Sequence, residues 1–453
     1  MSTQPRRVVI IGGGYLGVWV YRFLMRRAGK LVRNGQIQVT MITPKNYHSF
    51  HGFTAEALTG VMSIANRQSP LRLVMRHAAL VRAHAEHVDT ARKIVRVKMV
   101  GDETIREIPY DDVVLGNGSY DLMDTIPGMR QHGFSVKEPG GVLSTRNQLI
   151  RMLETAEGLS DTAAAQAMLT VVVGGGGFAG VELAANIAEM FHIVKSNFPA
   201  LQQHKARVIL VHSGSALVPQ LRPRYDRLAD YITRELEKWG VEIILNTRLA
   251  HVRSGGVELS DGTFIPSRTV ISTVGQKSMV MPGTEAFTRT ADGLIQTDDR
   301  LRVPGFEGVW TGGDTASVPH ISGVPCPANA LWAIMHGKQI GINIAQAAKG
   351  QPPKKLTYRG LGQAASMGMM KGASELYGMQ FTGFIGWWLR FGFFILFMPS
   401  RRQAVRVVGD FFWLNFLGRY QTSMESVDPG ALESKRAKES TATMEIAAIT
   451  PAQ

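Results

Sequence analysis

Six glycines are spaced so that two turns of the chain can each cradle a dinucleotide. The spacing GxGxxG occurs at Gly12, Gly14 and Gly17 and again at Gly175, Gly177 and Gly180. In such a turn the first glycine allows the bend, the second lets the backbone approach a pyrophosphate, and the third lets helix and strand pack closely. The repeat predicts two dinucleotide sites, and a chain that holds two dinucleotides usually passes electrons between them.

The elements around each turn fit this prediction. An apolar β-branched run precedes each turn, at Val8 to Ile11 and at Thr170 to Val173, and a segment of helical character follows it. A second apolar run comes after each helix, at Ile37 to Thr43 and at Ala206 to His212. Buried parallel strands have this continuous apolar pattern. The sequence therefore predicts an α/β fold in which a βαβ unit occurs twice.

A third stretch indicates which dinucleotides these are. In "GVWTGGDTASVP", from Gly308 to Pro319, the pair Gly313 and Asp314 closes an apolar strand. A carboxylate at that place can accept hydrogen bonds from the ribityl hydroxyls of a flavin, which predicts a flavin in one of the two sites.

Composition restricts the kind of protein. The length of 453 residues favours two or three domains, and 19% charged residues are too few for a disordered chain. A single cysteine, Cys326, excludes a disulfide, a CxxC redox pair and a cysteine-rich metal site, so redox chemistry needs a bound cofactor and no metal is predicted. No signal-peptide pattern precedes the first strand, which predicts a location on the cytoplasmic side. The net charge of +14 favours an anionic partner, and because no nucleic-acid module is recognisable, a membrane surface is preferred.

The order of these motifs resembles the type II NADH:quinone oxidoreductases, the single-subunit flavoproteins of respiratory chains, over roughly residues 6 to 420. The resemblance is carried by the two glycine turns, "GVELA" after the second, "YDDVVLGNGS" (110–119), "TVISTVG" (269–275), the Gly313-Asp314 pair, and "LTYRGLGQAASMG" (356–368). It implies two Rossmann-like dinucleotide-binding domains, with FAD on Gly12, Gly14 and Gly17 and the nicotinamide cofactor on Gly175, Gly177 and Gly180. It also implies hydride transfer from NADH or NADPH to FAD, followed by transfer of two electrons to a membrane quinone.

Two positions depart from the pattern for binding ribose. Thr43 stands at the end of the first βαβ unit and His212 at the end of the second, where an acidic residue normally receives the ribose hydroxyls. Without a carboxylate at His212, a 2′-phosphate is not repelled, and Ser213, Arg222 and Arg224 are candidate donors to it. NADPH therefore stays open beside NADH, and Thr43 and His212 are also interpreted as ordinary residues at strand ends.

The resemblance also bears on the chemistry. Glu182, in "GVELA", matches a glutamate that the family places at the nicotinamide site and links to substrate handling and proton movement. A carboxylate near a helix N-terminus is also expected for structural reasons alone. On the quinone side, Leu331 and Met335 stand where the family has glutamines, and Asn329 or His336 are possible substitutes from neighbouring turns.

The C-terminal part predicts an interaction surface. Residues 379–421 contain nine of the chain's nineteen phenylalanines and three of its seven tryptophans, and Pro399 divides them into two candidate helices. Arginines at positions 401, 402, 406 and 419 stand beside the aromatic residues. This favours amphipathic helices on an anionic membrane surface, with a single span or a homodimer interface as alternatives.

Together these observations predict a discontinuous FAD-binding domain (1–125 and 295–378), an NAD(P)H-binding domain (140–294), membrane-associated helices (379–425) and a disordered tail (426–453). The expected protein is a peripheral, monotopic enzyme on the cytoplasmic face of the cell membrane. Two alternatives are an NADPH-preferring flavin reductase with another membrane acceptor, and a flavoprotein-like membrane adaptor without turnover.

Overall fold

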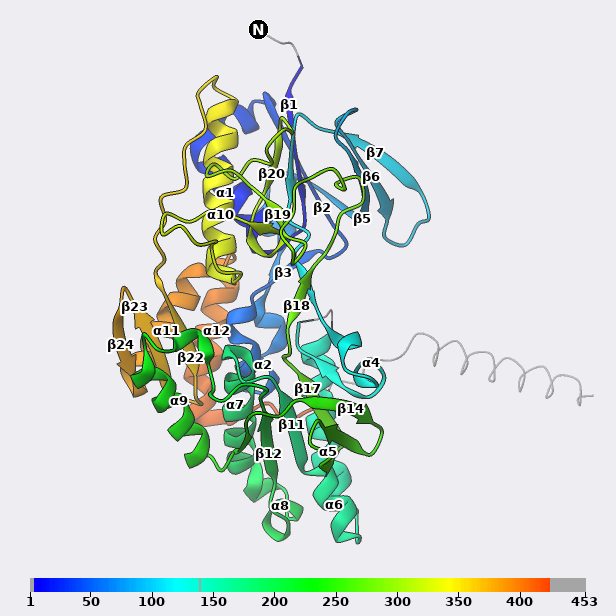
Figure 1. The fold of residues 1–453 in the computed structure, drawn as a ribbon, viewed down its shortest axis with the longest axis vertical. Coiled ribbons are helices and arrows are strands. Elements are labelled where there is room, and N and C mark those ends of the chain that lie inside the picture. Colours follow the sequence, from blue (N-terminus) through cyan, green and yellow to red (C-terminus); the bar gives the residue numbers. More distant parts are fainter. Residues whose placement is uncertain (1–3, 138–139, 424–453) are drawn as a thin grey trace, which may run out of the picture.

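The computed structural model describes residues 4–137 and 140–423. Two halves lie one above the other along the long axis, each built around its own sheet, and the C-terminal helices lie beside the junction between them (Figure 1). The tail at 426–453 lies outside the described residues.

The upper half contains a seven-stranded sheet whose strands come from two separate parts of the chain. In spatial order these are β20 (Val309–Thr311), β8 (Asp112–Leu115), β1 (Arg6–Ile11), β2 (Ile37–Thr43), β5 (Ala79–Asp89), β6 (Ile94–Met99) and β7 (Ile105–Pro109). The strands from β20 to β5 run parallel, and β5, β6 and β7 form an antiparallel meander. The carboxyl ends of β1, β2 and β20 therefore lie at the same edge of the sheet.

Alternation along β1 explains why both faces of this sheet are covered. Val8 and Ile10 point into a core made with α1 (Tyr15–Arg33) and α10 (Ala330–Ala347). Val9 and Ile11 point into a second core on the opposite face. Glycines bring α1 and α10 close together, since a Cβ at Gly341 would lie 2.3 Å from Val20 O.

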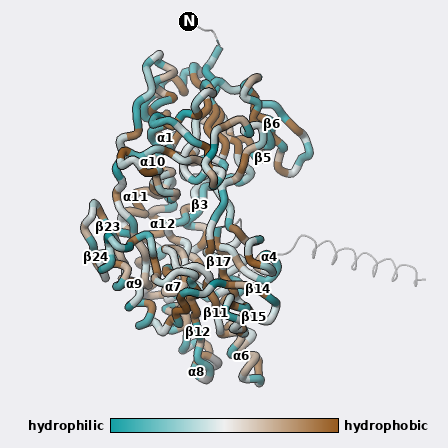
Figure 2. The backbone as a smooth tube through the Cα atoms, in the orientation of Figure 1, coloured by the Kyte–Doolittle hydropathy of each residue, from teal (hydrophilic) through white to brown (hydrophobic). Residues whose placement is uncertain are grey.

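The lower half repeats this arrangement around a five-stranded parallel sheet. The spatial order is β10 (Phe134–Ser135), β17 (Thr269–Ser272), β11 (Thr170–Gly174), β12 (Arg207–Val211) and β13 (Glu242–Ile244). Its helices are α5 (Gly141–Glu157), α6 (Thr162–Met168), α7 (Phe178–Val194) and α9 (Asp226–Lys238), and a small antiparallel sheet is formed by β14 (Leu249–Arg253), β15 (Gly256–Leu259) and β16 (Phe264–Pro266). Hydrophobic residues are concentrated along strands such as β11 and β12 (Figure 2). The predicted α/β class with a repeated βαβ unit is confirmed.

Two kinds of connection join the halves. The strands β9 (Ser119–Asp121) and β18 (Gln276–Ser278) pair antiparallel where the chain crosses from one half to the other. In addition, the segment between β2 and β5 reaches the lower half, where Phe53, Leu58 and Met62 share one core with α7 and the C-terminal helices. This segment contains β3 (Tyr47–Ser49), α2 (Thr54–Leu58), β4 (Gln68–Pro70) and α3 (Leu71–Val74).

The C-terminal part begins with a three-stranded antiparallel sheet, β22 (Gly362–Ser366), β23 (Gly372–Leu376) and β24 (Met379–Thr382). Two helices follow, α11 (Gly383–Phe397) and α12 (Arg401–Leu417), so Pro399 separates two helices as predicted. Within the described part of the chain, none of the helices has the length and apolar character needed to cross a bilayer.

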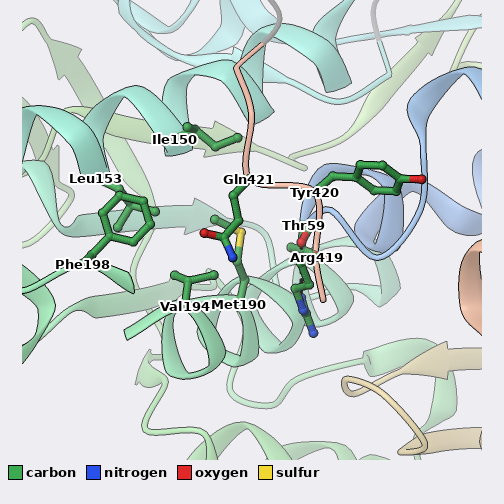
Figure 3. Close-up of a pocket in the computed structure, with 9 residues that line it drawn as sticks. All are labelled: Thr59, Ile150, Leu153, Met190, Val194, Phe198, Arg419, Tyr420 and Gln421. Atoms are coloured by element: carbon green, nitrogen blue, oxygen red, sulfur yellow. Dashed lines mark hydrogen bonds between the residues drawn. The ribbon is translucent and has the colours of Figure 1, made fainter. Parts of the chain in front are cut away.

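After α12 the chain folds back onto the lower half. Residues 419–421 and side chains of α5 and α7 enclose a small pocket (Figure 3), whose lining consists of Thr59, Ile150, Leu153, Met190, Val194, Phe198, Arg419, Tyr420 and Gln421. Tyr420 N–H donates to Gly60 O at 2.9 Å, and the Arg419 guanidinium forms a buried ion pair with Glu189 of α7. Arg419 is therefore not available for a lipid headgroup, contrary to the prediction for this arginine. The remaining short elements are α4 (Met129–His132), α8 (Ala200–Gln203), β19 (Ile295–Gln296) and β21 (Ala316–Ser317).

Candidate functional site

The first glycine turn has three positions with three different surroundings. Gly12, directly after β1, has φ of +99°, a conformation that favours glycine. A Cβ at Gly17 would lie 2.1 Å from Gly12 O, so only glycine lets α1 approach the strand this closely. At Gly14, the N-cap of α1, an added Cβ would meet no neighbouring atom within 4 Å. The open position is the one at which the backbone and the helix N-terminus face a phosphate.

The second turn repeats this division of roles. Gly175 has φ of +110°, and a Cβ at Gly180 would lie 1.7 Å from Gly175 O. Gly177 caps α7, and the nearest atom to its Cβ position is Gln220 Nε2 at 3.6 Å. Both turns therefore fit a dinucleotide, because two glycines serve the packing and the middle one faces open space.

The Gly313-Asp314 turn lies beside the first glycine turn. It follows β20 as a 3-10 turn, Gly313–Thr315, and a Cβ at the preceding Gly312 would lie 3.2 Å from Leu16 of α1. The Asp314 carboxylate accepts a hydrogen bond from Ser119 Oγ at 2.6 Å and lies 3.5 Å from Lys137 Nζ. Asp314 thus lies in a polar cluster at the sheet edge where β1 and β20 end.

Thr43 and His212 occupy corresponding places in the two halves. Thr43 ends β2 in a buried position, with its hydroxyl 3.2 Å from the Cβ position of Gly13. His212 follows β12, and its Nδ1 accepts a hydrogen bond from the Gly176 N–H at 3.2 Å. The acceptor role of Nδ1 leaves Nε2 of a neutral ring as a donor. Both side chains therefore touch the glycine turn of their own half, where the resemblance places the ribose.

The two arginines proposed to read a 2′-phosphate have other contacts. Arg222 forms ion pairs with Asp226 at 2.7 Å and with Asp230 at 2.6 Å. Arg224 is exposed, with its guanidinium 5.2 Å from the ring centre of Tyr225. Two carboxylates of α9 therefore already neutralise Arg222, whereas Arg224 has no carboxylate partner among the described residues.

Glu182 belongs to a buried cluster of three charges. Its carboxylate accepts a hydrogen bond from the Ser366 N–H at 2.8 Å and lies 2.9 Å from the Arg390 guanidinium of α11. Arg390 also pairs with Glu56 of α2 at 2.5 Å and donates to Gly52 O at 2.7 Å. The side chains of Arg390 and Glu56 are 1% and 2% exposed, whereas that of Glu182 is 19% exposed. Glu182 is therefore the member of the cluster that solvent or a substrate can reach.

The surroundings change how readily Glu182 holds a proton. Burial raises the pKa of the Glu182 carboxyl from 4.5 to about 7; Arg390 opposes this rise and the like charge of Glu56 adds to it. A carboxyl that titrates near neutral pH suits proton transfer. Glu182 shares the Arg390 cation with a second acid, Glu56, and its role in proton movement stays a prediction beside the structural alternative.

The two residues at α10 that were candidate hydrogen-bond partners of a quinone carbonyl already have partners within the protein. His336 is 2% exposed and its Nδ1 accepts the Gly313 N–H at 2.9 Å, while burial lowers the pKa of its imidazole to about 3. Asn329 caps α10 by accepting the Trp332 N–H at 3.0 Å. Leu331 and Met335 are partly buried apolar residues. Cys326 packs against the core beside α10, and burial raises the pKa of its thiol to about 11.

Sequence reasoning missed four residues of this site: Glu56, Ser119, Lys137 and Arg390. Ser119 closes the "YDDVVLGNGS" motif, so its place beside Asp314 follows once the two strands are known to be neighbours. For Arg390 the signal was an arginine inside an aromatic helix, which is costly unless the charge is paired. Nothing in the sequence identified Glu56 as its partner, because the two residues are 334 positions apart.

Comparisons with known proteins bear on the family and the fold of the chain. Residues 4–349 match the family model of the pyridine nucleotide-disulphide oxidoreductases. The type II NADH:quinone oxidoreductase Ndh of Mycobacterium tuberculosis is 27% identical over 408 residues, which cover 86% of this chain and 84% of that protein. The type II NADH:quinone oxidoreductase of Staphylococcus saprophyticus is 24% identical over 391 residues, with coverage of 84% and 92%.

A solved structure of NDH2 from Plasmodium falciparum in complex with NADH superimposes with a TM-score of 0.81 at 15% identity and covers 92% of this chain and 100% of that one. At this identity the superposition supports the fold. The resemblance stated from the sequence motifs is confirmed by the two bacterial relatives, which match across most of the chain.

Proposed function

Because the chain belongs to the pyridine nucleotide-disulphide oxidoreductase family, we propose that it is a membrane-associated flavoprotein that oxidises NADH and reduces a quinone. The observation that carries this proposal is the matched pair of glycine turns, each with one glycine open to a phosphate, together with Glu182 in the helix that begins at the second turn. Relatives named type II NADH:quinone oxidoreductases, which match most of this chain, support the same conclusion.

We assign FAD to the upper half and the nicotinamide to the lower half. The FAD site comprises Gly12, Gly14, Gly17, Thr43, Gly313 and Asp314, and the nicotinamide site comprises Gly175, Gly177, Gly180 and His212. FAD, when bound, supplies the hydride acceptor and the electron donor. The protein aligns the two cofactors and keeps water away from them. The proposed domain limits are 1–125 and 295–378 for the FAD domain, 140–294 for the nicotinamide domain and 379–425 for the membrane helices.

An anaerobic titration tests this function. The purified protein is expected to be yellow, to bleach when NADH is added, and to regain its colour when a soluble quinone follows. Bleaching without recovery points to a reductase with another acceptor. A colourless protein, or a flavin that NADH does not reduce, contradicts the proposal and favours the membrane adaptor.

The nicotinamide preference gives a first prediction. In the His212→Glu variant, a carboxylate beside the second glycine turn should accept from the ribose diol of NADH and repel the phosphate of NADPH. The ratio of kcat/KM for NADH to that for NADPH should rise by about ten-fold to a hundred-fold, as expected for one charge in a partly solvated site. An unchanged ratio, measured at equal flavin loading, means that residue 212 does not face the ribose.

The outward sides of the C-terminal helices support binding to a membrane. On the inward side, Trp387, Phe391 and Phe411 pack against one another in the core. The exposed apolar side chains, each 44% to 78% accessible, are Phe384, Ile385, Trp388 and Leu396 on α11, and Val405, Val408, Phe412, Trp413, Phe416 and Leu417 on α12. Apolar residues at this density on a protein surface mark an interaction site.

Charge favours a bilayer as the partner of this surface. Arg401, Arg402 and Arg406 are exposed on α12. Burial lowers the pKa of Arg22 on α1, and repulsion by Arg26 and Arg401 adds to this effect. Within residues 4–137 and 140–423 the three arginines of α12 form no ion pair, so anionic headgroups suit them. We therefore propose peripheral binding at the cytoplasmic face, with a homodimer interface as the alternative.

A second prediction separates these two partners. The double variant Trp388→Glu/Phe412→Glu should lose at least ten-fold in affinity for vesicles of phosphatidylglycerol and phosphatidylcholine. Each aromatic side chain that becomes buried in the bilayer contributes about 1.5 to 3 kcal/mol to membrane binding. The control is Phe264→Glu, which alters an exposed phenylalanine in the lower half. If the double variant still sediments with vesicles but changes from dimer to monomer, the surface is a dimer interface.

A further inference from the structure

The buried cluster of Glu56, Arg390 and Glu182 holds two acids and one base. Arg390 Nη1 lies 2.5 Å from Glu56 Oε1, and its Nη2 lies 2.9 Å from Glu182 Oε1. If both acids are ionised, the cluster has a net charge of −1. Arg390 alone cannot neutralise both carboxylates, so one added proton would make the cluster neutral.

Aromatic rings lie beside the cation of the cluster. The Arg390 guanidinium lies 4.6 Å from the ring centre of Phe394 and 5.9 Å from that of Phe53. Aromatic rings provide an apolar surrounding in which an unpaired carboxylate is costly. Of the two carboxylates beside Arg390, Glu182 is the one that is partly exposed and can exchange a proton with its surroundings.

The groups that act on the Glu182 carboxylate come from three elements, and two of them are charged. α11 supplies Arg390, α2 supplies Glu56, and β22 supplies only the Ser366 N–H. Farther along α7, Glu189 pairs with Arg419, which follows α12. On α9, Glu235 pairs with Lys238 and Lys371. Glu56 is thus the acid whose charge acts on Glu182.

The reaction proposed above requires one proton from outside the cofactors. NADH and one proton reduce a quinone to a quinol, and NAD⁺ leaves. NADH supplies a hydride, which carries two electrons and one proton. The second proton of the quinol comes from outside the cofactors. We propose that Glu56 is a positioning residue that acts through Arg390 to keep this proton on Glu182, from which it passes to the reduced quinone. Glu182 then takes a new proton from water. This inference rests on the proposed function.

The pH profile tests the inference. Because the pKa of Glu182 lies at about 7, the rate of quinone reduction should fall as pH rises through that value and the carboxyl loses its proton. In Glu56→Gln the neighbouring negative charge is gone, so the pKa of Glu182 falls and the loss of rate should occur about 1 to 2 pH units lower. Reduction of the bound flavin by NADH, measured by stopped flow, should keep its wild-type rate.

The matched control is Glu189→Gln, which alters a second buried glutamate of α7. Glu189 pairs with Arg419 rather than with Arg390. Its pH profile should equal that of the wild type even if its stability falls. An unshifted profile in Glu56→Gln, or an equal shift in both variants, overturns the inference.

The variant Glu182→Gln separates this inference from the proposed function. It should slow quinone reduction, measured from the pre-reduced flavin, and lose the dependence on pH near 7. A normal quinone rate and pH profile in Glu182→Gln overturns the inference and leaves the proposed function intact. Wild-type protein that reduces no quinone contradicts the proposed function itself.

Discussion

The Gly180→Ala variant should be destabilised by about 3 kcal/mol and should lose NADH-dependent reduction of its flavin by a hundred-fold or more, because a methyl group at this position meets backbone. A Cβ there would lie 1.7 Å from Gly175 O and 3.0 Å from Thr273 Oγ1. The strand that leads into the turn is fully buried and cannot retreat, so α7 must move away from β11. Urea unfolding and stopped-flow reduction of the flavin measure the two effects.

Gly177→Ala is the matched control, because this glycine belongs to the same motif but faces open space. Its backbone is extended and its Cβ position has only Gln220 Nε2 nearby, at 3.6 Å, so the unfolding free energy should stay within about 0.5 kcal/mol of the wild type. The affinity for NADH should nevertheless fall about ten-fold, because the methyl group lies where the backbone approaches a pyrophosphate. Unchanged NADH affinity in this variant would mean that the second turn does not bind the nicotinamide dinucleotide.

Arg390→Met should cost about 3 to 5 kcal/mol of stability at neutral pH, the range expected when one partner of a buried ion pair is removed. The substitution leaves Glu56 and Glu182 without their shared cation among aromatic rings. Both acids should then favour the protonated form. The pKa of Glu182 in the folded state, already raised by burial, loses the opposing effect of Arg390 and rises further above the unfolded value, so stability is retained at low pH and lost as pH rises through the folded value.

Urea unfolding between pH 5 and pH 8 checks this result. The loss of stability in Arg390→Met should be smallest at pH 5 and should grow toward pH 8. The triple variant Arg390→Met/Glu56→Gln/Glu182→Gln, which has no charge in the cluster, should recover most of the lost stability and its pH dependence should disappear. A destabilisation that does not vary with pH would point to lost packing of the long arginine side chain instead.

The local parts of the fold and the site were predictable from the sequence. The glycine spacing identified both turns, and the apolar runs before Gly12 and Gly175 identified the strands that lead into them. Pro399 marked the break between the last two helices, since proline cannot continue a helix without losing a hydrogen bond. Each of these signals lies within a few residues of the feature that it predicts.

The long-range pairings were not predictable in this way. Arg419 stood in an aromatic, basic segment and was expected at a membrane surface, yet it is buried against Glu189. The segment that contains Glu56 lies between two strands of the upper sheet but packs in the core of the lower half. Periodicity shows which face of an element is apolar, but it does not show which distant element covers that face.

The shared core has a consequence for how the two halves can move. A hinge rotation about the paired strands β9 and β18 would have to draw Phe53 and Leu58 out of a hydrophobic core and separate Glu56 from Arg390. It would also break the hydrogen bond from Tyr420 N–H to Gly60 O, which joins the residues after α12 to the same segment. Rotation of one half against the other therefore carries the cost of opening this core and of separating a buried ion pair.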